Sequence, residues 1–200
     1  MSILPSSHVA DPAMSLPHRR RSTPALARQG ALILALGLGV GLSLLAPSAR
    51  ADALQDGLSA VNRKDYPEAI RQLEPLAKAG NAQAQLQIGL LHYHGHGVRE
   101  SDAQARQWFE KAARQGSAPA QFQLANMYAY GLAELPEGAD PYRVAAQWYF
   151  EAARQGLAEA QYSLGILFLT GSGVQQSQEE AQKWIVRAAA QGHADARAYL

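Results

Sequence analysis

The sequence has 200 residues, 48% hydrophobic and 18% charged, which is enough for one ordinary domain or a short repeat array with its own core. It contains no cysteine, which excludes disulfide frameworks, thiolate metal sites and cysteine nucleophiles. Residues 1–51 hold five arginines and one aspartate, whereas residues 52–200 hold thirteen basic and sixteen acidic side chains. A slightly acidic body is a poor nucleic-acid binder, because contacts between basic side chains and phosphates supply most of that affinity.

The first fifty residues have the order of a secretory signal peptide. A basic segment from Arg19 to Arg28 contains no acid, and an apolar run over residues 31–46 follows it. Ala49-Arg50-Ala51 then provides a small-x-small cleavage site. The apolar run is shorter than the roughly 20 residues that a membrane span needs, and it contains glycines.

We therefore expect residues 1–51 to be a signal peptide that is cleaved after Ala51. The stretch before Met14 reads as a disordered extension, and Met14 is an alternative start to Met1. The mature protein would be periplasmic or secreted, without an integral membrane span. An uncleaved N-terminal anchor is the alternative.

The rest of the chain repeats one unit of two helices. Tryptophans, alanine pairs and closing glycines recur in register, at Trp108, Trp148 and Trp184, at Ala112-Ala113, Ala152-Ala153 and Ala188-Ala189, and at Gly116, Gly156 and Gly192. The predicted repeats are residues 81–116, 117–156 and 157–192. A divergent helix pair over 52–80 precedes them as a cap, and residues 193–200 begin a partial helix. One such pair cannot bury its apolar face alone, so the repeats must stack.

Local signals place the turns and the second helices. Gly95 and Gly97 can adopt the positive φ that a tight turn between helices needs, as can Gly171 and Gly173. Capping-box spacing marks the start of the second helix at Asp65-x-x-Glu68, Ser101-x-x-Gln104 and Ser177-x-x-Glu180. The second repeat uses Asp140 before Pro141 instead.

These motifs together resemble the Sel1-like repeat family, relatives of tetratricopeptide repeats. The shared pattern is an A-x-x-x-L-G helix, a G-x-G-V turn, an A-x-x-W helix and a closing AA-x-x-G. The resemblance implies an all-α fold, a right-handed α-solenoid of stacked antiparallel helix pairs. It also implies an adaptor or scaffold. The second repeat departs from the pattern, because GLAELPEG replaces the G-x-G-V turn and adds a loop at Leu132–Ala139.

Catalytic and metal-binding chemistry has little support in the sequence. No P-loop, nucleophile elbow, H-E-x-x-H or dinucleotide-binding glycine pattern occurs, so we predict no enzyme and no cofactor. Imidazoles bind zinc and copper, and three histidines lie within five residues. His92, however, occupies the aromatic column of Tyr128 and Phe168. Only His94 and His96 remain as metal ligands, and two ligands make a weak site.

A partner-binding surface is predicted on the first helix of each repeat, because that helix lines the concave face in solenoids that this chain resembles. Residues that do not repeat between units, spaced i, i+4, i+7 and i+11, form one stripe on these helices. The alternative is an ordinary solvated helix face. The stripe is rich in amides and nearly uncharged. Besides Pro119 and Glu159, the candidate residues on it are Gln83, Gln87, Leu90, His94, Gln123, Asn126, Tyr130, Ser163, Ile166 and Thr170.

The predicted function is a non-enzymatic protein–protein interaction scaffold in the bacterial cell envelope. An envelope or secreted protein is the expected partner, with polysaccharide or peptidoglycan-linked machinery as another. One alternative is a periplasmic inhibitor or immunity protein that binds a single secreted enzyme. A second alternative is a carrier of metal or a small ligand through His94 and His96. The inserted loop is a second candidate for partner contact.

Overall fold

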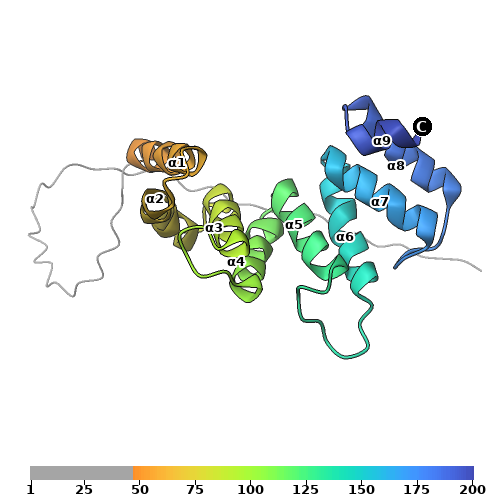
Figure 1. Cartoon of the computed structure of the whole chain (residues 1–200), viewed down its shortest axis with the longest axis horizontal. Coiled ribbons are helices and arrows are strands. Elements are labelled where there is room, and N and C mark those ends of the chain that lie inside the picture. Colours follow the sequence, from red (N-terminus) through yellow and green to blue (C-terminus); the bar gives the residue numbers. More distant parts are fainter. Residues whose placement is uncertain (1–46) are drawn as a thin grey trace, which may run out of the picture. The chain divides into compact units, whose positions relative to one another are not determined.

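The computed structural model describes residues 47–200, and these residues form helices joined by turns and one longer loop (Figure 1). The predicted basic segment and apolar run, and both candidate starts, lie outside the described residues. The predicted cleavage bond after Ala51 lies inside the first helix. Along residues 47–200 no helix is both long enough and apolar enough to span a membrane.

The helices pack in chain order, each against the next, which confirms the predicted solenoid of stacked helix pairs. A first and a second helix alternate along the row (Figure 1). The helices are α1 (Pro47–Asn62), α2 (Tyr66–Lys78), α3 (Ala82–His94), α4 (Asp102–Arg114), α5 (Ala118–Ala129), α6 (Pro141–Arg154), α7 (Ala158–Thr170), α8 (Gln178–Ala190) and α9 (Ala194–Tyr199).

Side-chain caps start the second helix of each pair, as the sequence predicts. The side chains of Asp65, Ser101 and Ser177 each accept a hydrogen bond from the backbone N–H three residues later, at 3.3, 3.3 and 3.2 Å. Asp140 Oδ1 accepts from the Tyr142 N–H at 2.9 Å, and Pro141 is the first residue of α6. These caps satisfy backbone donors that a helix start otherwise leaves without a partner.

The G-x-G turns join the two helices of a repeat and also contact the preceding repeat. Gly95 and Gly97 have φ of +66° and +72°, which confirms the prediction from sequence. A Cβ atom on Gly97 would lie 2.7 Å from Tyr66 Cβ in the first turn of α2. The second glycine of the turn is therefore required for two reasons: it adopts a positive φ, and it allows a close approach between repeats.

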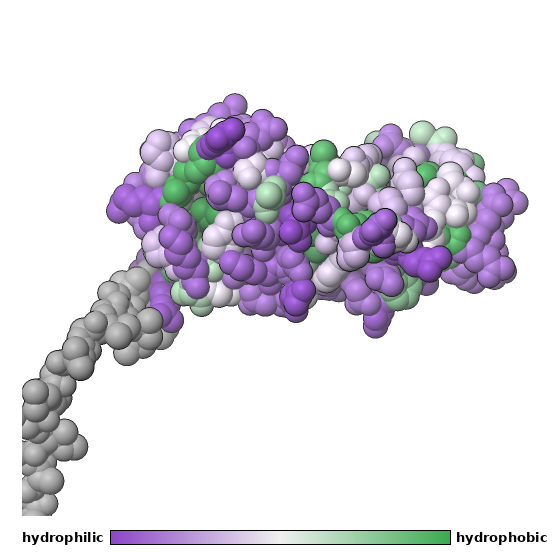
Figure 2. Space-filling view, turned by 90° about the horizontal axis from the view of Figure 1, so that it is seen from below, coloured by the Kyte–Doolittle hydropathy of each residue, from purple (hydrophilic) through white to green (hydrophobic). Residues whose placement is uncertain are grey.

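Alanines and a few large side chains fill the space between the helices. The alanine pairs are at most 8% exposed, and Phe109, Leu124 and Ile185 are fully buried. Trp184 is buried, while Trp108 and Trp148 are half-buried. On the face in Figure 2, hydrophilic residues separate the hydrophobic ones into small patches. Among the described residues, the buried polar ones are glutamines, so the charged side chains lie outside this core.

Candidate partner-binding surface

The first helices of the repeats carry almost no charge. Neither α3 nor α5 contains an aspartate, glutamate, lysine or arginine, and α7 contains only Glu159. The ion pairs between residues 47 and 200 all join side chains within one second helix, namely α2, α4, α6 or α8. The repeats therefore present a neutral side built by first helices and a charged side built by second helices.

The ten candidate residues of the predicted stripe are all at least partly exposed, and Tyr130 is 73% exposed. Gln83, His94 and Thr170 are exposed as well, and the other six are half-buried. Leu90 also packs against the main core cluster. The Thr170 hydroxyl serves its own turn, because it donates to the Ile166 carbonyl at 3.1 Å.

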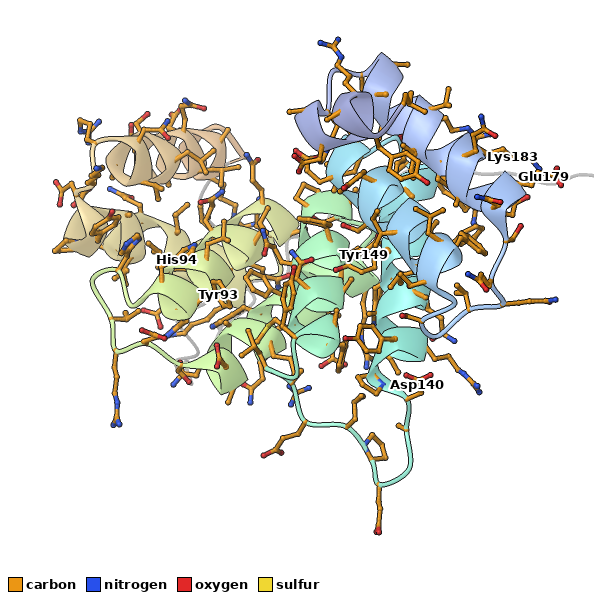
Figure 3. All side chains as sticks on the ribbon, turned by 45° about the vertical axis from the view of Figure 1, so that its right-hand side comes forward. Tyr93, His94, Asp140, Tyr149, Glu179 and Lys183 are labelled. Atoms are coloured by element: carbon orange, nitrogen blue, oxygen red, sulfur yellow. The ribbon has the colours of Figure 1, made fainter. Side chains whose placement is uncertain are left out.

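Three stripe residues from two repeats act on the hydroxyl of Tyr149, a residue of α6 that sequence reasoning missed. Tyr149 is 4% exposed, and its hydroxyl donates to Asn126 Oδ1 of α5 at 2.6 Å. Tyr130, at the end of α5, and Ser163, on α7, both affect the pKa of the same hydroxyl. Figure 3 labels Tyr149 among these helices. We call Asn126, Tyr130, Tyr149 and Ser163 the tyrosine cluster.

The environment of Tyr149 keeps its hydroxyl protonated. Burial raises the pKa of Tyr149 well above its ordinary value of 10.0, and Tyr130 raises it further, while a hydrogen bond with Ser163 opposes the rise. Tyr149 is therefore a neutral donor at any physiological pH. The residues at the position of Tyr149 in the other two repeats are Phe109 and Ile185. The hydroxyl of Tyr149 is therefore a polar group at an otherwise apolar repeat position, and this was the signal available in the sequence.

The histidines at the end of α3 form a separate group near the first turn of α2. The ring centroids of His94 and His96 are 5.3 Å apart, and the His96 ring stacks on Tyr66 at 4.5 Å. The His92 Nδ1 atom is buried without a hydrogen-bond partner. In the described part of the chain, no three histidines, cysteines or acidic residues gather closely enough to hold a metal ion. The pair of His94 and His96 thus gains no third ligand of these types.

The paired carboxylates of the repeats lie on the surface. Glu179 and Lys183, labelled in Figure 3, are 2.8 Å apart within α8. A hydrogen bond from Lys183 lowers the pKa of Glu179. Glu134 and Glu137 are exposed in the inserted loop. Exposed ion pairs within a helix contribute little beyond local stability.

The inserted loop is anchored to the second repeat. Ala133 and Leu135 are half-buried and pack against the main core cluster, while Leu132 is 37% exposed. The Leu132 N–H donates to the Met127 carbonyl at 2.8 Å, so the loop continues directly from the end of α5. It begins beside Tyr130 and thus borders the tyrosine cluster.

Comparison with known proteins agrees with this architecture. The Sel1 repeat model matches residues 82–117, 118–157 and 158–193, together more than half of the chain. The chain belongs to the Sel1 repeat family. Each match begins one residue after the corresponding repeat predicted from sequence. A crystal structure of a Sel1 repeat protein from Oxalobacter formigenes is 35% identical, with a TM-score of 0.67 over 72% of this chain and 56% of that one.

Further relatives differ in what their names describe. A protective antigen of uropathogenic Escherichia coli strains is 38% identical over 62% of this Sel1 repeat protein and 26% of that chain, with a TM-score of 0.56. An exopolysaccharide production negative regulator from Rhizobium meliloti is 29% identical over 70% of this chain, and one from Rhizobium leguminosarum is 27% identical over 74%. The chain spans 56% and 59% of the length of these two regulators.

Proposed function

We propose that this Sel1 repeat protein is a non-enzymatic scaffold of the bacterial cell envelope that binds a protein partner along the first helices of its repeats. The tyrosine cluster carries this proposal. It places polar groups from α5, α6 and α7 at one partly exposed position, on helices that are otherwise almost uncharged. Specific polar groups on a rigid, neutral surface are typical of a recognition site.

The ionisable groups support binding rather than catalysis. Apart from Tyr149, the side chains in residues 47–200 with a clearly shifted pKa are Glu68, Arg71, Glu179 and Lys183, all in exposed ion pairs within one helix. A general acid or base needs a pKa close to the working pH and a place beside the substrate. Tyr149 has its pKa moved away from neutrality, which suits a fixed hydrogen-bond donor.

Export to the envelope is the second part of the proposal. It is supported by the order of the basic segment, the apolar run and the small-x-small site ending at Ala51. Mass spectrometry of the chain recovered from its host tests this part. An N-terminus at Asp52 supports cleavage, whereas an intact apolar run in the recovered chain supports the anchored alternative.

The relatives supply a candidate process. Two of them are negative regulators of exopolysaccharide production, and they align with this chain over 150 and 157 residues. We propose that the partner of this protein belongs to the envelope machinery for polysaccharide production, held through protein contacts. Regulation by such a scaffold needs no chemistry of its own, because sequestering a partner changes its available concentration.

Affinity capture tests the proposal directly. The full chain with a C-terminal tag is expressed in its host, and captured proteins are compared with those of a variant carrying Gln87→Ala, Asn126→Ala and Tyr130→Ala. We expect the variant to lose the partner. A matched control carries Gln107→Ala, Lys111→Ala and Gln182→Ala, all exposed on second helices, and should keep it. Equal capture by all three chains would contradict a site on the first helices.

The same experiment separates the scaffold from an inhibitor. An inhibitor or immunity protein would capture one secreted enzyme in a fixed ratio and abolish its activity. A scaffold would capture a partner that remains active or that arrives with further proteins. A carrier using His94 and His96 would capture no protein, and would lose bound metal when both histidines are replaced.

A further inference from the structure

Asn126 has its side-chain orientation fixed by the tyrosine cluster. Its Oδ1 accepts the Tyr149 hydroxyl hydrogen at 2.6 Å, so the amide group turns its Nδ2 away from Tyr149. Between residues 47 and 200 no acceptor for this Nδ2 is found, and the atom is not among the buried polar atoms that lack a partner. The Nδ2 atom of Asn126 is therefore accessible to solvent from a half-buried position.

The neighbours of Asn126 reinforce this orientation. Ser163, whose hydroxyl belongs to α7, also interacts with the Tyr149 hydroxyl and so links a second repeat to this group. The Tyr149 ring is held in place by packing against Phe122, with ring centroids 5.8 Å apart. A buried, packed ring cannot follow Asn126 if the amide rotates. The donor on Asn126 is thus positioned before any partner arrives, which lowers the entropic cost of binding.

We infer that this surface binds an extended, uncharged peptide segment of a partner, with Asn126 Nδ2 donating to a main-chain carbonyl, Tyr130 covering the adjacent side chain, and Tyr149 acting as the positioning residue for Asn126. This inference rests on the proposed function and names the chemistry of the partner. Tyrosine supplies a large contact area at low conformational cost, and Tyr130 is 73% exposed one helical turn from Asn126.

The charge distribution favours an uncharged segment. A peptide rich in lysine or glutamate would find no counter-charge on α3 or α5, because these helices carry no acidic or basic residue apart from histidine. Its charges would lose hydration without compensation. A neutral peptide main chain loses less hydration free energy, because amide donors and acceptors on the stripe replace its hydrogen bonds to water. Gln87 and Gln123 lie in the same column of α3 and α5 and offer such groups.

Selection from a phage-displayed library of random short peptides, with the purified full chain as the target, tests the inference. We expect selected peptides to be uncharged and to compete with one another. The dissociation constant of one selected peptide is then measured for wild type, Asn126→Ala, Tyr149→Phe and the double variant. Losing one neutral hydrogen bond should weaken binding by about three- to tenfold in each single variant.

The double variant distinguishes a role of Tyr149 in positioning Asn126 from a role in packing. If Tyr149 acts through Asn126, Tyr149→Phe should have no further effect in the Asn126→Ala background. Ser163→Ala should cause a smaller loss than Tyr149→Phe. Tyr128→Phe, which removes the hydroxyl of a tyrosine of α5 outside the tyrosine cluster, should bind as wild type does. Circular dichroism checks that each variant is folded. If Tyr149→Phe does not fold, Ser163→Ala takes its place in the test.

Several outcomes would overturn the inference. Selected peptides that are charged, or equal losses from Tyr149→Phe in both backgrounds, would contradict it while leaving a protein-binding scaffold intact. Binding of purified exopolysaccharide at this site, without any selected peptide, would assign the surface to a sugar polymer. If neither a peptide nor a captured protein is found, the proposed function fails together with the inference.

Discussion

Gln155 and Gln121 are joined side chain to side chain across 34 residues of sequence, with Gln155 Nε2 donating to Gln121 Oε1 at 2.8 Å. Gln121 is 5% exposed, and its own Nε2 donates to the Ala113 carbonyl of α4 at 3.1 Å. The same arrangement recurs with Gln115, Gln85 and Ala77, and with Gln191, Gln161 and Ala153. At the start of α9, Arg197 takes the glutamine position and donates to the Ala189 carbonyl. A buried glutamine thus ties each repeat to the helix before it and to the end of its own second helix.

Replacing Gln121 by alanine should destabilise the protein by about 1–3 kcal/mol, because two hydrogen bonds between helices are lost and a buried site is left unfilled. Urea unfolding followed by circular dichroism measures the change. Gln107→Ala, at an exposed position of α4, should change stability by less than about 0.5 kcal/mol. Equal unfolding midpoints for the two variants would show that the glutamine pairs do not hold the repeats together.

Gly165→Ala should also be destabilising, although alanine is normally the better helix former. A Cβ atom at Gly165 would lie 2.6 Å from Ile185 Cγ1, and Ile185 is fully buried. The resulting overpacking should cost about 1–3 kcal/mol, more than the roughly 1 kcal/mol gained in helix propensity. Thermal unfolding measures the loss.

A double variant checks the cause of that loss. In an Ile185→Ala background the clash is absent, so Gly165→Ala should cost less there than in the wild type. Additive losses would mean that Gly165 is required for a reason other than its contact with Ile185.

Much of the fold could be predicted from the sequence, because the helix caps and turns are specified by local sequence patterns. Caps at Asp65, Ser101 and Ser177 and glycines of positive φ depend on spacings of a few residues, and the repeat register then fixes which helices pair. The tyrosine cluster depends instead on how α5, α6 and α7 cross. Tyr149 and Asn126 are 23 residues apart, and no local pattern indicates that their side chains meet.

The burial of the glutamines could not be predicted from the sequence, for a different reason. Glutamine is usually a surface residue, so its recurrence in the repeats does not by itself indicate a buried position. Only the structure shows that the hydrogen-bonding groups of Gln85, Gln121 and Gln161 are satisfied by a carbonyl and by a second glutamine. A polar residue that recurs in register beside core alanines is the signal that would have identified this column.

The inserted loop should be dispensable for binding but not for stability. Leu135→Ser removes a half-buried contact with the core and should lower the free energy of unfolding by about 1–2 kcal/mol. Leu132→Ser, at a more exposed position, should have less effect. Both variants should capture the same partner as the wild type in the affinity experiment. Loss of the partner in either variant would move the binding site from the first helices to the loop.

Tyr149 should make the protein's stability depend on pH in the alkaline range. Its pKa in the folded protein is raised by burial, whereas an unfolded chain has a tyrosine pKa of about 10. Below that value both states keep the proton, and the contribution of Tyr149 to stability is fully present. As the pH rises further, the unfolded chain ionises first. The free energy of unfolding then falls by up to about 1.4 kcal/mol per pH unit, until the folded-state pKa is reached.

Urea unfolding at a series of pH values on either side of about pH 10 measures this dependence. The Tyr149→Phe variant should lack the alkaline component, so its stability should approach or exceed that of the wild type as the pH rises. Tyr142→Phe, which removes the hydroxyl of a tyrosine that is 43% exposed, should keep the wild-type slope. Parallel curves for wild type and Tyr149→Phe would mean that the Tyr149 hydroxyl is hydrated in solution. In that case it could not hold Asn126 in the orientation on which peptide binding depends.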